Sequence, residues 1–222
     1  MLMLSEKNEL LKLTTTEEEL KDGGSFYSIQ LVDDKNEEVG YCNFMKSTDK
    51  GAYGKEYPII WIYKIEVNDP DNRGKAYGKA LIDATEYFVS TNFDVEQIQG
   101  KFYPDRGCYD VVEKFYLRND YKFFDLDDWG HLGICKDLTS KVIDKNTGEK
   151  IEKKQEIIQR VGAKIIEPPT VKFISLEEQK AEKEAKEAKT KQIKAIISDA
   201  EKEAKTEEKA EATKSNKDDL DL

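Results

Sequence analysis

The run Arg73-Gly-Lys-Ala-Tyr-Gly78 combines small residues with two cations at the junction of two very different stretches. Before it, Ile59–Val67 is almost continuously apolar and β-branched or aromatic, as a central strand should be. After it, apolar residues recur at helical spacing as far as Phe88. The first N–H groups of a helix have no partner within the helix, and the helix dipole favours an anion there. Small residues let phosphate oxygens approach these donors, so the turn predicts a pyrophosphate cradle, with charge added by Arg73 and Lys75.

Two other phosphate-binding patterns are excluded. The Walker pattern requires G-x-x-x-x-G-K-[ST], whereas Gly51-Ala-Tyr-Gly54-Lys55 has the wrong spacing and is followed by Glu56. The dinucleotide pattern G-x-G-x-x-G does not occur. For residues 73–78, an ordinary glycine-containing helix start remains the alternative.

The other residue types that often carry chemistry are sparse. His131 is the single histidine, and the three cysteines, Cys42, Cys108 and Cys135, are far apart and form no C-x-x-C pair. We therefore expect no metal site, no disulfide framework and a reducing, cytoplasmic location. The acidic residues Asp125, Asp127 and Asp128 lack the glycine and the final glutamate of a calcium loop and are interpreted as a turn.

The elements that would position the cradle alternate between strands and helices. Helices are predicted from Ala76 to Phe88 and over Tyr109–Leu117, with Val112, Phe115 and Tyr116 on the buried side of the second. Strands are predicted over residues 9–14, Ser25–Val32, Glu38–Lys46, Ile59–Val67, Val95–Phe102, Tyr121–Phe124 and Leu132–Lys136. This order predicts an α/β fold, of the mixed α+β kind, in which helices flank a central mixed β-sheet.

Two local patterns give more specific expectations. Thr14–Thr16 precede Glu17–Glu19, which is the chemistry of a capping box, and Gly23 and Gly24 then supply a stop, so a helix of about two turns is predicted there. In the helix after the cradle, Lys79, Asp83 and Glu86 are expected to face solvent.

The strand-turn-helix unit resembles a known family. Ile65-Glu-Val67, Pro70 and Arg73-Gly-Lys-Ala-Tyr-Gly78 are similar to the acetyl-CoA-binding motif of the GNAT superfamily of N-acetyltransferases, Arg/Gln-x-x-Gly-x-Gly/Ala after a strand. Further along, Phe115-Tyr116-Leu-Arg-Asn-Asp-Tyr121 resembles the second hallmark of that family, Phe-Tyr-x-x-x-Gly-Phe. The resemblance covers roughly residues 25–137.

The resemblance implies a GNAT-like fold and an enzyme that transfers an acetyl group from acetyl-CoA, as co-substrate, to a primary amine by direct attack. The strand ending at Val67 would splay from the strand Val95–Phe102 to admit the pantetheine arm, bound by main-chain groups near Ile65, Glu66 and Val67. Main-chain N–H groups of Gly74, Lys75, Ala76, Tyr77 and Gly78 would hold the pyrophosphate beside Arg73. Tyr116 would protonate the leaving thiolate, and a carboxylate such as Glu66, or an ordered water, would take the proton of the amine.

The chain also departs from the family pattern. Ala76 replaces the first glycine of the motif, Asp120-Tyr121 replaces Gly-Phe, and the N-terminal helices that commonly shape the acceptor site are nearly missing. The alternative function is therefore a catalytically weak or inactive GNAT-like scaffold that acts as a protein-interaction module through its C-terminal helix. Tyr116 as a core aromatic and Glu66 as a solvent-facing residue likewise remain open.

Three segments are expected along the chain. Residues 1–138 are predicted to form the GNAT-like domain, residues 139–174 an extension with a hairpin around Asn146-Thr-Gly148 and a short helix from Glu152 to Arg160 that Pro168 and Pro169 end, and residues 175–222 a tail rich in Lys, Glu and Ala. Ser175-Leu-Glu-Glu178 is a capping box that opens a helix in this tail, and the residues from about Thr213 are expected to be disordered.

Charge limits the classes of partner. The 222 residues carry a formal net charge of −10, and 37% of them are charged. Nucleic-acid binding depends on basic surface, and this chain has no basic stripe with interleaved aromatic residues, so no nucleic-acid partner is expected. No run of 18 apolar residues occurs, so no membrane span is expected. Acetyl-CoA, an amine acceptor and a protein bound by the C-terminal helix are the partners that the sequence suggests.

Overall fold

The computed structural model describes residues 1–33, 35–50, 56–68, 75–102, 109–125, 132–145 and 147–194. The chain divides into two compact units, Met1–Ile174 and Ser175–Leu222. Residues 139–174, predicted as an extension, lie in the first unit. Arg73, Gly74, Cys108, His131 and the tail beyond residue 194 lie outside the described residues.

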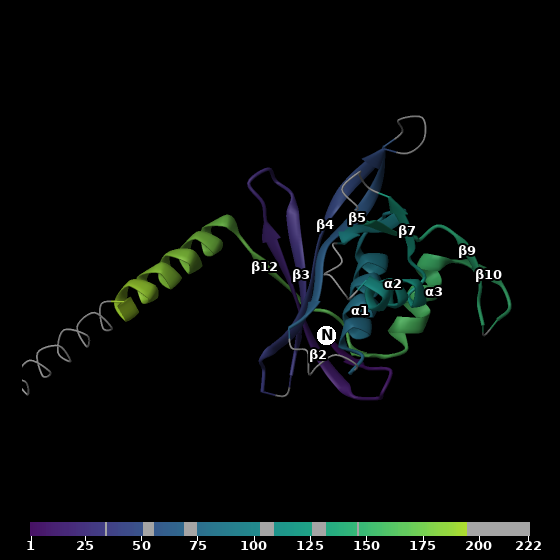
Figure 1. Ribbon diagram of the computed structural model, residues 1–222, viewed down its shortest axis with the longest axis horizontal. Helices are drawn as coiled ribbons and strands as arrows, with labels where there is room; N and C mark the ends of the chain where they lie inside the picture. Colours follow the sequence, from purple (N-terminus) through teal and green to yellow (C-terminus); the bar gives the residue numbers. More distant parts are fainter. Residues whose placement is uncertain are drawn as a thin grey trace, which may run out of the picture. The chain divides into compact units, whose positions relative to one another are not determined.

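The first unit is a long mixed sheet with helices packed against it (Figure 1). Its strands are β1 (Leu2–Leu4), β2 (Leu10–Glu19), β3 (Ser25–Val32), β4 (Glu38–Lys50), β5 (Glu56–Val67), β6 (Gln97–Phe102), β7 (Lys122–Asp125), β8 (Leu132–Asp137), β9 (Lys141–Ile143), β10 (Lys150–Glu152), β11 (Ile165–Glu167) and β12 (Val171–Ile174). Its helices are α1 (Tyr77–Asn92), α2 (Tyr109–Arg118) and α3 (Lys153–Gly162).

The described strands of the main sheet run in the order β11-β1-β2-β3-β4-β5-β6-β8-β7, and β12 pairs with β2 beside this path. The β5–β6 and β12–β2 pairs are parallel and the others antiparallel. Strands β9 and β10 form a separate hairpin. The predicted mixed sheet with flanking helices and the small hairpin are confirmed. The structure adds that β5 and β6, on either side of α1 in the chain, pair in parallel.

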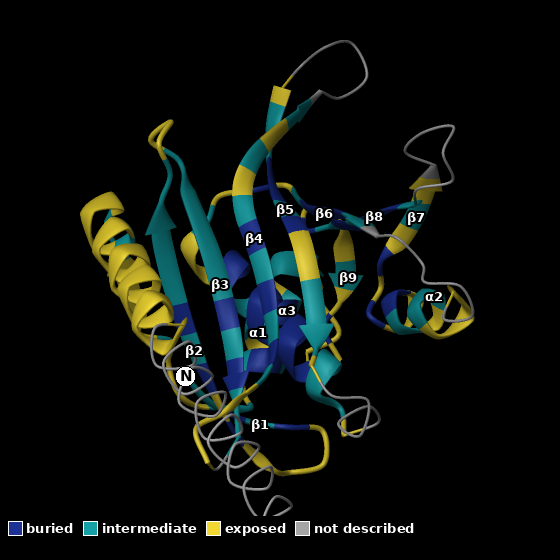
Figure 2. Ribbon diagram, turned by 60° about the vertical axis from the view of Figure 1, so that its left-hand side comes forward, coloured by how far each residue is buried: buried dark blue, intermediate teal, exposed yellow. Residues whose placement is uncertain are grey.

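One face of the sheet is buried against α1. Every second residue of a strand points to this side and contributes to the core. Among these residues are Leu13, Ile29, Leu31, Phe44 and Ile60, each fully or almost fully buried. Rings of Tyr27, Phe44, Phe88 and Phe93 cluster there with centroids 5.2–6.0 Å apart. Figure 2 looks onto the opposite face of the sheet, with α1 and α3 behind it.

Several predicted elements need correction. The threonines and glutamates of residues 14–19 continue strand β2 rather than forming a helix, because all eight residues Lys12–Glu19 pair with β3. Strand β4 extends to Lys50, beyond the predicted end at Lys46. The helix predicted from Glu152 ends at Gly162, and β11 lies between it and the prolines.

In the second unit, residues 176–194 are helical. Ser175 and Glu178 form the predicted capping box: each backbone N–H is bonded by the side chain of the other, at 3.1 and 3.2 Å. Among the described residues, no helix is both long and apolar enough to cross a membrane.

Candidate functional site

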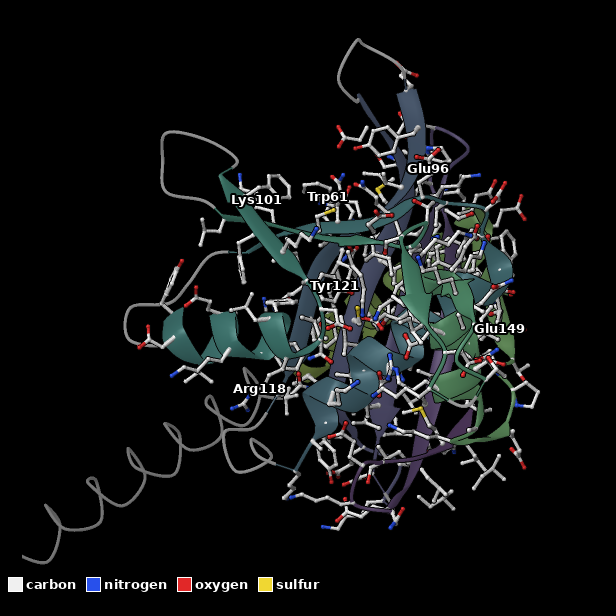
Figure 3. All side chains as sticks on the ribbon, turned by 90° about the vertical axis from the view of Figure 1, so that its right-hand side faces the viewer. Trp61, Glu96, Lys101, Arg118, Tyr121 and Glu149 are labelled. Atoms are coloured by element: carbon white, nitrogen blue, oxygen red, sulfur yellow. The ribbon has the colours of Figure 1, made fainter. Side chains whose placement is uncertain are left out.

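Strand β5 parts from β6 halfway along its length. The two strands pair in parallel from Ile59–Gln97 to Ile62–Gly100. Beyond that pair, β6 continues beside β8, whereas β5 runs on to Val67 beside β4. Within the described part of the chain, the backbone of residues 63–67 therefore has no strand on its β6 side. Trp61 of β5 and Lys101 of β6 are labelled near this point in Figure 3.

A β-bulge starts the parting. Ile62 and Lys64 lie opposite the consecutive residues Phe44 and Asn43, so Tyr63 is an extra residue on β5. Bulges bend a strand and increase its local twist, which turns the end of β5 away from β6. Gly100 closes the last pair: a Cβ at that position would lie 3.0 Å from the carbonyl oxygen of Ile62, so any larger residue would press on the pair.

Beyond the bulge, Ile65 and Glu66 face opposite sides of the sheet. Ile65 pairs with the buried Cys42, on the side of the helices. Glu66 pairs with Tyr41 on the other face, where it accepts a hydrogen bond from the Tyr41 hydroxyl at 2.7 Å and forms an ion pair with Lys64. These two donors, Lys64 first, lower the pKa of Glu66, whose side chain is 42% exposed. The predicted base is thus ionised at neutral pH and lies on the face away from α1.

Tyr116 lies on the helical side of the same strands. Its ring is buried, packs edge-on against Phe115, Tyr121 and Phe123, and is 4% exposed. Burial raises the pKa of Tyr116, and the nearby thiol of Cys42 raises it further. Because Cys42 pairs with Ile65, Tyr116 lies beneath the parted length of β5.

The second sequence motif, Phe115 to Tyr121, has a clear structural role as the end of α2. The N–H of Tyr121 bonds the carbonyl of Tyr116 and the N–H of Asp120 bonds that of Leu117, both at 3.1 Å, which is a Schellman motif. Its left-handed residue is Asp120, with φ 60°, where glycine is usual. The accompanying apolar contact is made by the rings of Tyr116 and Tyr121, 5.5 Å apart.

The described part of the cradle is the start of α1. Ala76 is the N-cap, and its backbone is left-handed, with φ 64° and ψ 15°. The expectation that Ala76 would be helical is therefore wrong: its methyl group occupies a conformation that favours glycine. The first turn of α1 has no acidic side chain and no side-chain cap, so its N–H dipoles stay uncompensated by the helix's own residues.

The two motifs meet in space. A Cβ on Gly78, in the first turn of α1, would lie 3.4 Å from the ring of Phe115 on α2. The ammonium group of Lys75 lies 6.0 Å from the ring centre of Tyr77. The structure thus brings Gly78, in the first turn of α1, beside Phe115 of α2.

The expectation that Asp83 and Glu86 face solvent is wrong. Both are 1% exposed. Glu86 pairs with Lys136 of β8 at 2.6 Å, and Asp83 pairs with Lys79 and with Arg160 of α3, the latter at 2.9 Å. The partners Lys136 and Arg160 are 50 and 77 residues away along the chain, so helical spacing alone could not locate them, whereas Lys79 is one turn away on α1.

The remaining candidates show no reactive arrangement among the described residues. Burial raises the pKa of the Cys42 thiol to about 12, which keeps it protonated. Cys135 is half-buried and donates to the amide oxygen of Gln97 at 3.2 Å. In the described ranges, no group of three His, Cys, Asp or Glu side chains could hold a metal ion.

No protein-family model matches the sequence, and no curated protein matches it. Solved structures do match part of it, and they include GNAT-family acetyltransferases. One is an acetyltransferase of the GNAT family from Staphylococcus aureus Mu50, with 16% identity over 54% of this chain and 71% of that one and a TM-score of 0.40. Another is Arabidopsis thaliana NAA60 in complex with a bisubstrate analogue, with 16% identity over 52% of this chain and 77% of that one and a TM-score of 0.41.

Proposed function

We propose that Met1–Ile174 binds acetyl-CoA and transfers its acetyl group to a primary amine. The observation that carries the proposal is the parting of β5 from β6 directly before the strand-to-helix turn. A slot between parallel strands offers backbone donors and acceptors to an extended amide-containing arm, as another strand would. The turn that follows offers helix N–H groups to a diphosphate.

Each group has a defined part in this proposal. Backbone groups of Ile65, Glu66 and Val67 hold the pantetheine arm. Those of residues 74–78 hold the pyrophosphate, with charge from Arg73 and Lys75. The uncompensated N-terminus of α1 supports the second role, because no carboxylate of the first turn competes with the phosphates.

The transfer is one displacement. The amine nitrogen bonds to the acetyl carbon, the carbon–sulfur bond breaks and the sulfur leaves as a thiolate. Tyr116 gives its phenolic proton to the sulfur. The pKa raised by burial keeps the phenol protonated at neutral pH and also makes it a weaker acid. The ionised Glu66 takes the proton of the amine, directly or through water.

Binding is tested by thermal unfolding with acetyl-CoA. A ligand that binds only the native state raises Tm by mass action. Gly78→Asp places a carboxylate at the cradle and should abolish the rise, whereas Gly78→Ala, whose Cβ makes ordinary contact with Phe115, should keep it. Identical Tm values with and without millimolar acetyl-CoA in the unmutated protein would refute the proposal.

Transfer is tested by release of free thiol from acetyl-CoA in the presence of primary amines. Tyr116→Phe should lower the rate by about 10²-fold or more and leave the acetyl-CoA Tm shift in place. The matched control is Tyr109→Phe, on the same helix but 39% exposed, which should react as the unmutated protein does. Equal rates for Tyr116→Phe and the control would remove Tyr116 from the mechanism.

A second function is favoured by two observations. The methyl group of Ala76 stands in a left-handed backbone at the cradle, and nearly all side chains of residues 176–194 are exposed. Together they fit a scaffold with little or no transferase activity that binds a protein partner through its C-terminal helix. Truncation after Ile174 should then abolish capture of that partner and leave the Tm of the first unit unchanged.

A further inference from the structure

Aromatic side chains border the slot between β5 and β6 on the sheet face away from α1, the face that Figure 2 shows. The two strands part after the Ile62–Gly100 pair. Ile60 and Ile62 are buried on the helical side, so Trp61 between them faces the other way, and Met45 lies opposite it on β4. A large aromatic side chain and a thioether therefore stand beside the point where the slot begins.

The bulge holds a second aromatic ring on the β5 side of the slot. The ring of Tyr63, the extra residue of the bulge, lies 6.0 Å from that of Phe26, and its hydroxyl donates to the sulfur of Met45 at 2.7 Å. Phe26 and Met45 pair with each other on the face away from α1, so these contacts place Tyr63 there too. Although it is held at both points, Tyr63 remains 53% exposed. A ring that is fixed and exposed is a preorganised surface for a ligand.

A further ring stands across the slot, on the β6 side. Lys101 of β6, Gly133 of β8 and Phe124 of β7 form one row, directly beyond the Gly100–Ile134 pair. Ile134 is buried on the helical side, so this row faces away from α1. The ring of Phe124 lies over Gly133, because a Cβ on Gly133 would come within 2.3 Å of it. Phe124, which is 37% exposed, thus leans across β8 towards the slot.

Trp61, Tyr63 and Phe124 form what we call the outer mouth of the slot. On the opposite, helical side, the buried ring of Tyr116 lies beneath the parted length of β5. The start of α1, to which we assign the pyrophosphate, is on the helical side as well. An amine that attacks an acetyl group held between the strands therefore approaches through the outer mouth, where its carbon skeleton meets the three aromatic side chains.

We propose that the acetyl acceptor is an arylalkylamine, a primary amine joined to an aromatic ring by a short alkyl chain. This inference rests on the proposed function and names the substrate class of the same site. The ring of the ligand lies against Trp61 and Tyr63 with Phe124 as the opposite wall, and its alkyl chain carries the amine to the Ile62–Gly100 pair. Aromatic pairs gain about two- to tenfold in affinity beyond the area that they bury, so the outer mouth favours an aromatic ring over a saturated ring of the same size.

Binding of two matched amines to the full chain, followed by NMR titration, tests the inference. 2-Phenylethylamine and 2-cyclohexylethylamine share the aminoethyl chain and differ in whether the six-membered ring is aromatic. With or without saturating coenzyme A, 2-phenylethylamine should bind saturably and about two- to tenfold more tightly than 2-cyclohexylethylamine. Equal affinities, or no saturable binding in either condition, would overturn the inference.

Variants of an exposed ring show whether the outer mouth is responsible. Tyr63→Leu keeps an apolar side chain but removes the ring, so the advantage of 2-phenylethylamine should disappear, whereas Tyr63→Phe should keep it. The matched control, Phe173→Leu on β12, removes a ring that is 54% exposed and should bind both amines as the unmutated protein does. An unchanged preference in Tyr63→Leu, or the same loss in the control, would overturn the inference.

Two further measurements separate this inference from the proposed function. Gly78→Asp should lose the acetyl-CoA Tm shift and keep the binding of 2-phenylethylamine, because the outer mouth and the cradle use different residues. In the thiol-release reaction, limiting 2-phenylethylamine should be acetylated at least twofold faster than limiting 2-cyclohexylethylamine. Equal acetylation of the two amines by an active protein would overturn the inference and leave the proposed function standing.

Discussion

Four described non-glycine residues have a backbone conformation that favours glycine, and the two at helix ends, Ala76 and Asp120, differ in what their side chains do. Ala76 and Asp120 both have φ near +60°. Asp is more tolerant of this region than Ala, and Asp120 also forms an ion pair with Lys153 at 2.7 Å. Ala76 makes no side-chain cap at the start of α1. Its left-handed conformation therefore costs about 1–2 kcal/mol, and no hydrogen bond of its side chain offsets this cost.

Ala76→Gly should therefore stabilise the protein. Relief of the left-handed strain outweighs the added freedom of the unfolded chain, and the free energy of unfolding should rise by about 0.5–1 kcal/mol. Urea denaturation measures this. The control, Ala80→Gly, makes the same change one turn later in regular buried helix and should destabilise by about 1 kcal/mol or more. A loss of stability in Ala76→Gly would contradict the left-handed assignment.

Asp83 makes stability depend on pH in the acid range. Burial acts to raise its pKa, but Lys79 and Arg160 together outweigh burial and leave the pKa below its usual value. A lowered folded pKa contributes stability above the unfolded pKa of about 3.9, and this stability is lost as pH falls through the folded value.

Asp83→Asn should accordingly flatten the acid limb of the stability curve. At pH 7 the variant should be less stable by about 1.5–3 kcal/mol, because the ionic partners of a buried carboxylate are lost. Its further loss below about pH 4 should be smaller than that of the unmutated protein. Asp110→Asn, on the exposed side of α2, is the charge-matched control and should follow the unmutated curve. Parallel acid limbs for Asp83→Asn and the control would contradict the assignment.

At the scale of elements, the sequence predicts a segment correctly where its local pattern agrees with the strand pairing and packing of the folded chain. Ile59–Val67 predicted the last nine of the 12 residues of β5, and helical spacing predicted α1, because both signals lie within one element. The predicted cradle and the second motif are also local patterns, and the structure adds that Gly78 of the first lies against the ring of Phe115 of the second. What local pattern could not give was any feature fixed by pairing between distant strands.

The wrong predictions arise where contacts between distant parts of the chain decide the structure. Thr14–Glu19 has capping chemistry, but eight pairs with β3 hold it as strand, so tertiary pairing overrides the local signal. The bulge at Tyr63 and the parting of β5 depend on registers with β4 and β6. Asp83 and Glu86 have the spacing of a solvated face, and only β8 and α3, which come later in the chain, bury them.

The buried Glu86–Lys136 pair joins α1 to β8, and a double-mutant cycle should show how strongly the two residues are coupled in the free energy of unfolding. Lys136→Met leaves Glu86 buried without its main cation and should destabilise by about 3–5 kcal/mol. Adding Glu86→Leu should recover most of this loss, since apolar residues of similar size replace buried pairs at little cost. Denaturation midpoints of the two single variants and the double variant measure the coupling. Additive losses would mean that the two groups act independently.

At the scale of the whole molecule, residues after 138 complete the body that begins at Met1. Strand β11 pairs with β1, β12 pairs with β2, and Arg160 of α3 neutralises the buried Asp83 of α1. Ile157 and Val161 of α3 are fully buried in the common core. Strand β2 therefore depends on the C-terminal part of this unit, since β12 pairs with it along Thr15–Glu18.

Two truncations should differ strongly in their thermal unfolding. Ending the chain after Leu138 removes α3, β11 and β12. The surface of α1 against which Ile157 and Val161 pack is then exposed, and Asp83 loses Arg160. The remaining chain should therefore lose its cooperative unfolding transition or melt far below the full chain. Ending it after Ile174 removes only the second unit and should leave Tm within a few degrees of the full chain. Thermal unfolding followed by circular dichroism measures both. Cooperative unfolding at an unchanged Tm in the shorter truncation would mean that residues 139–174 are an appendage, because buried apolar contacts and ionic partners cannot be removed from a core without loss of stability.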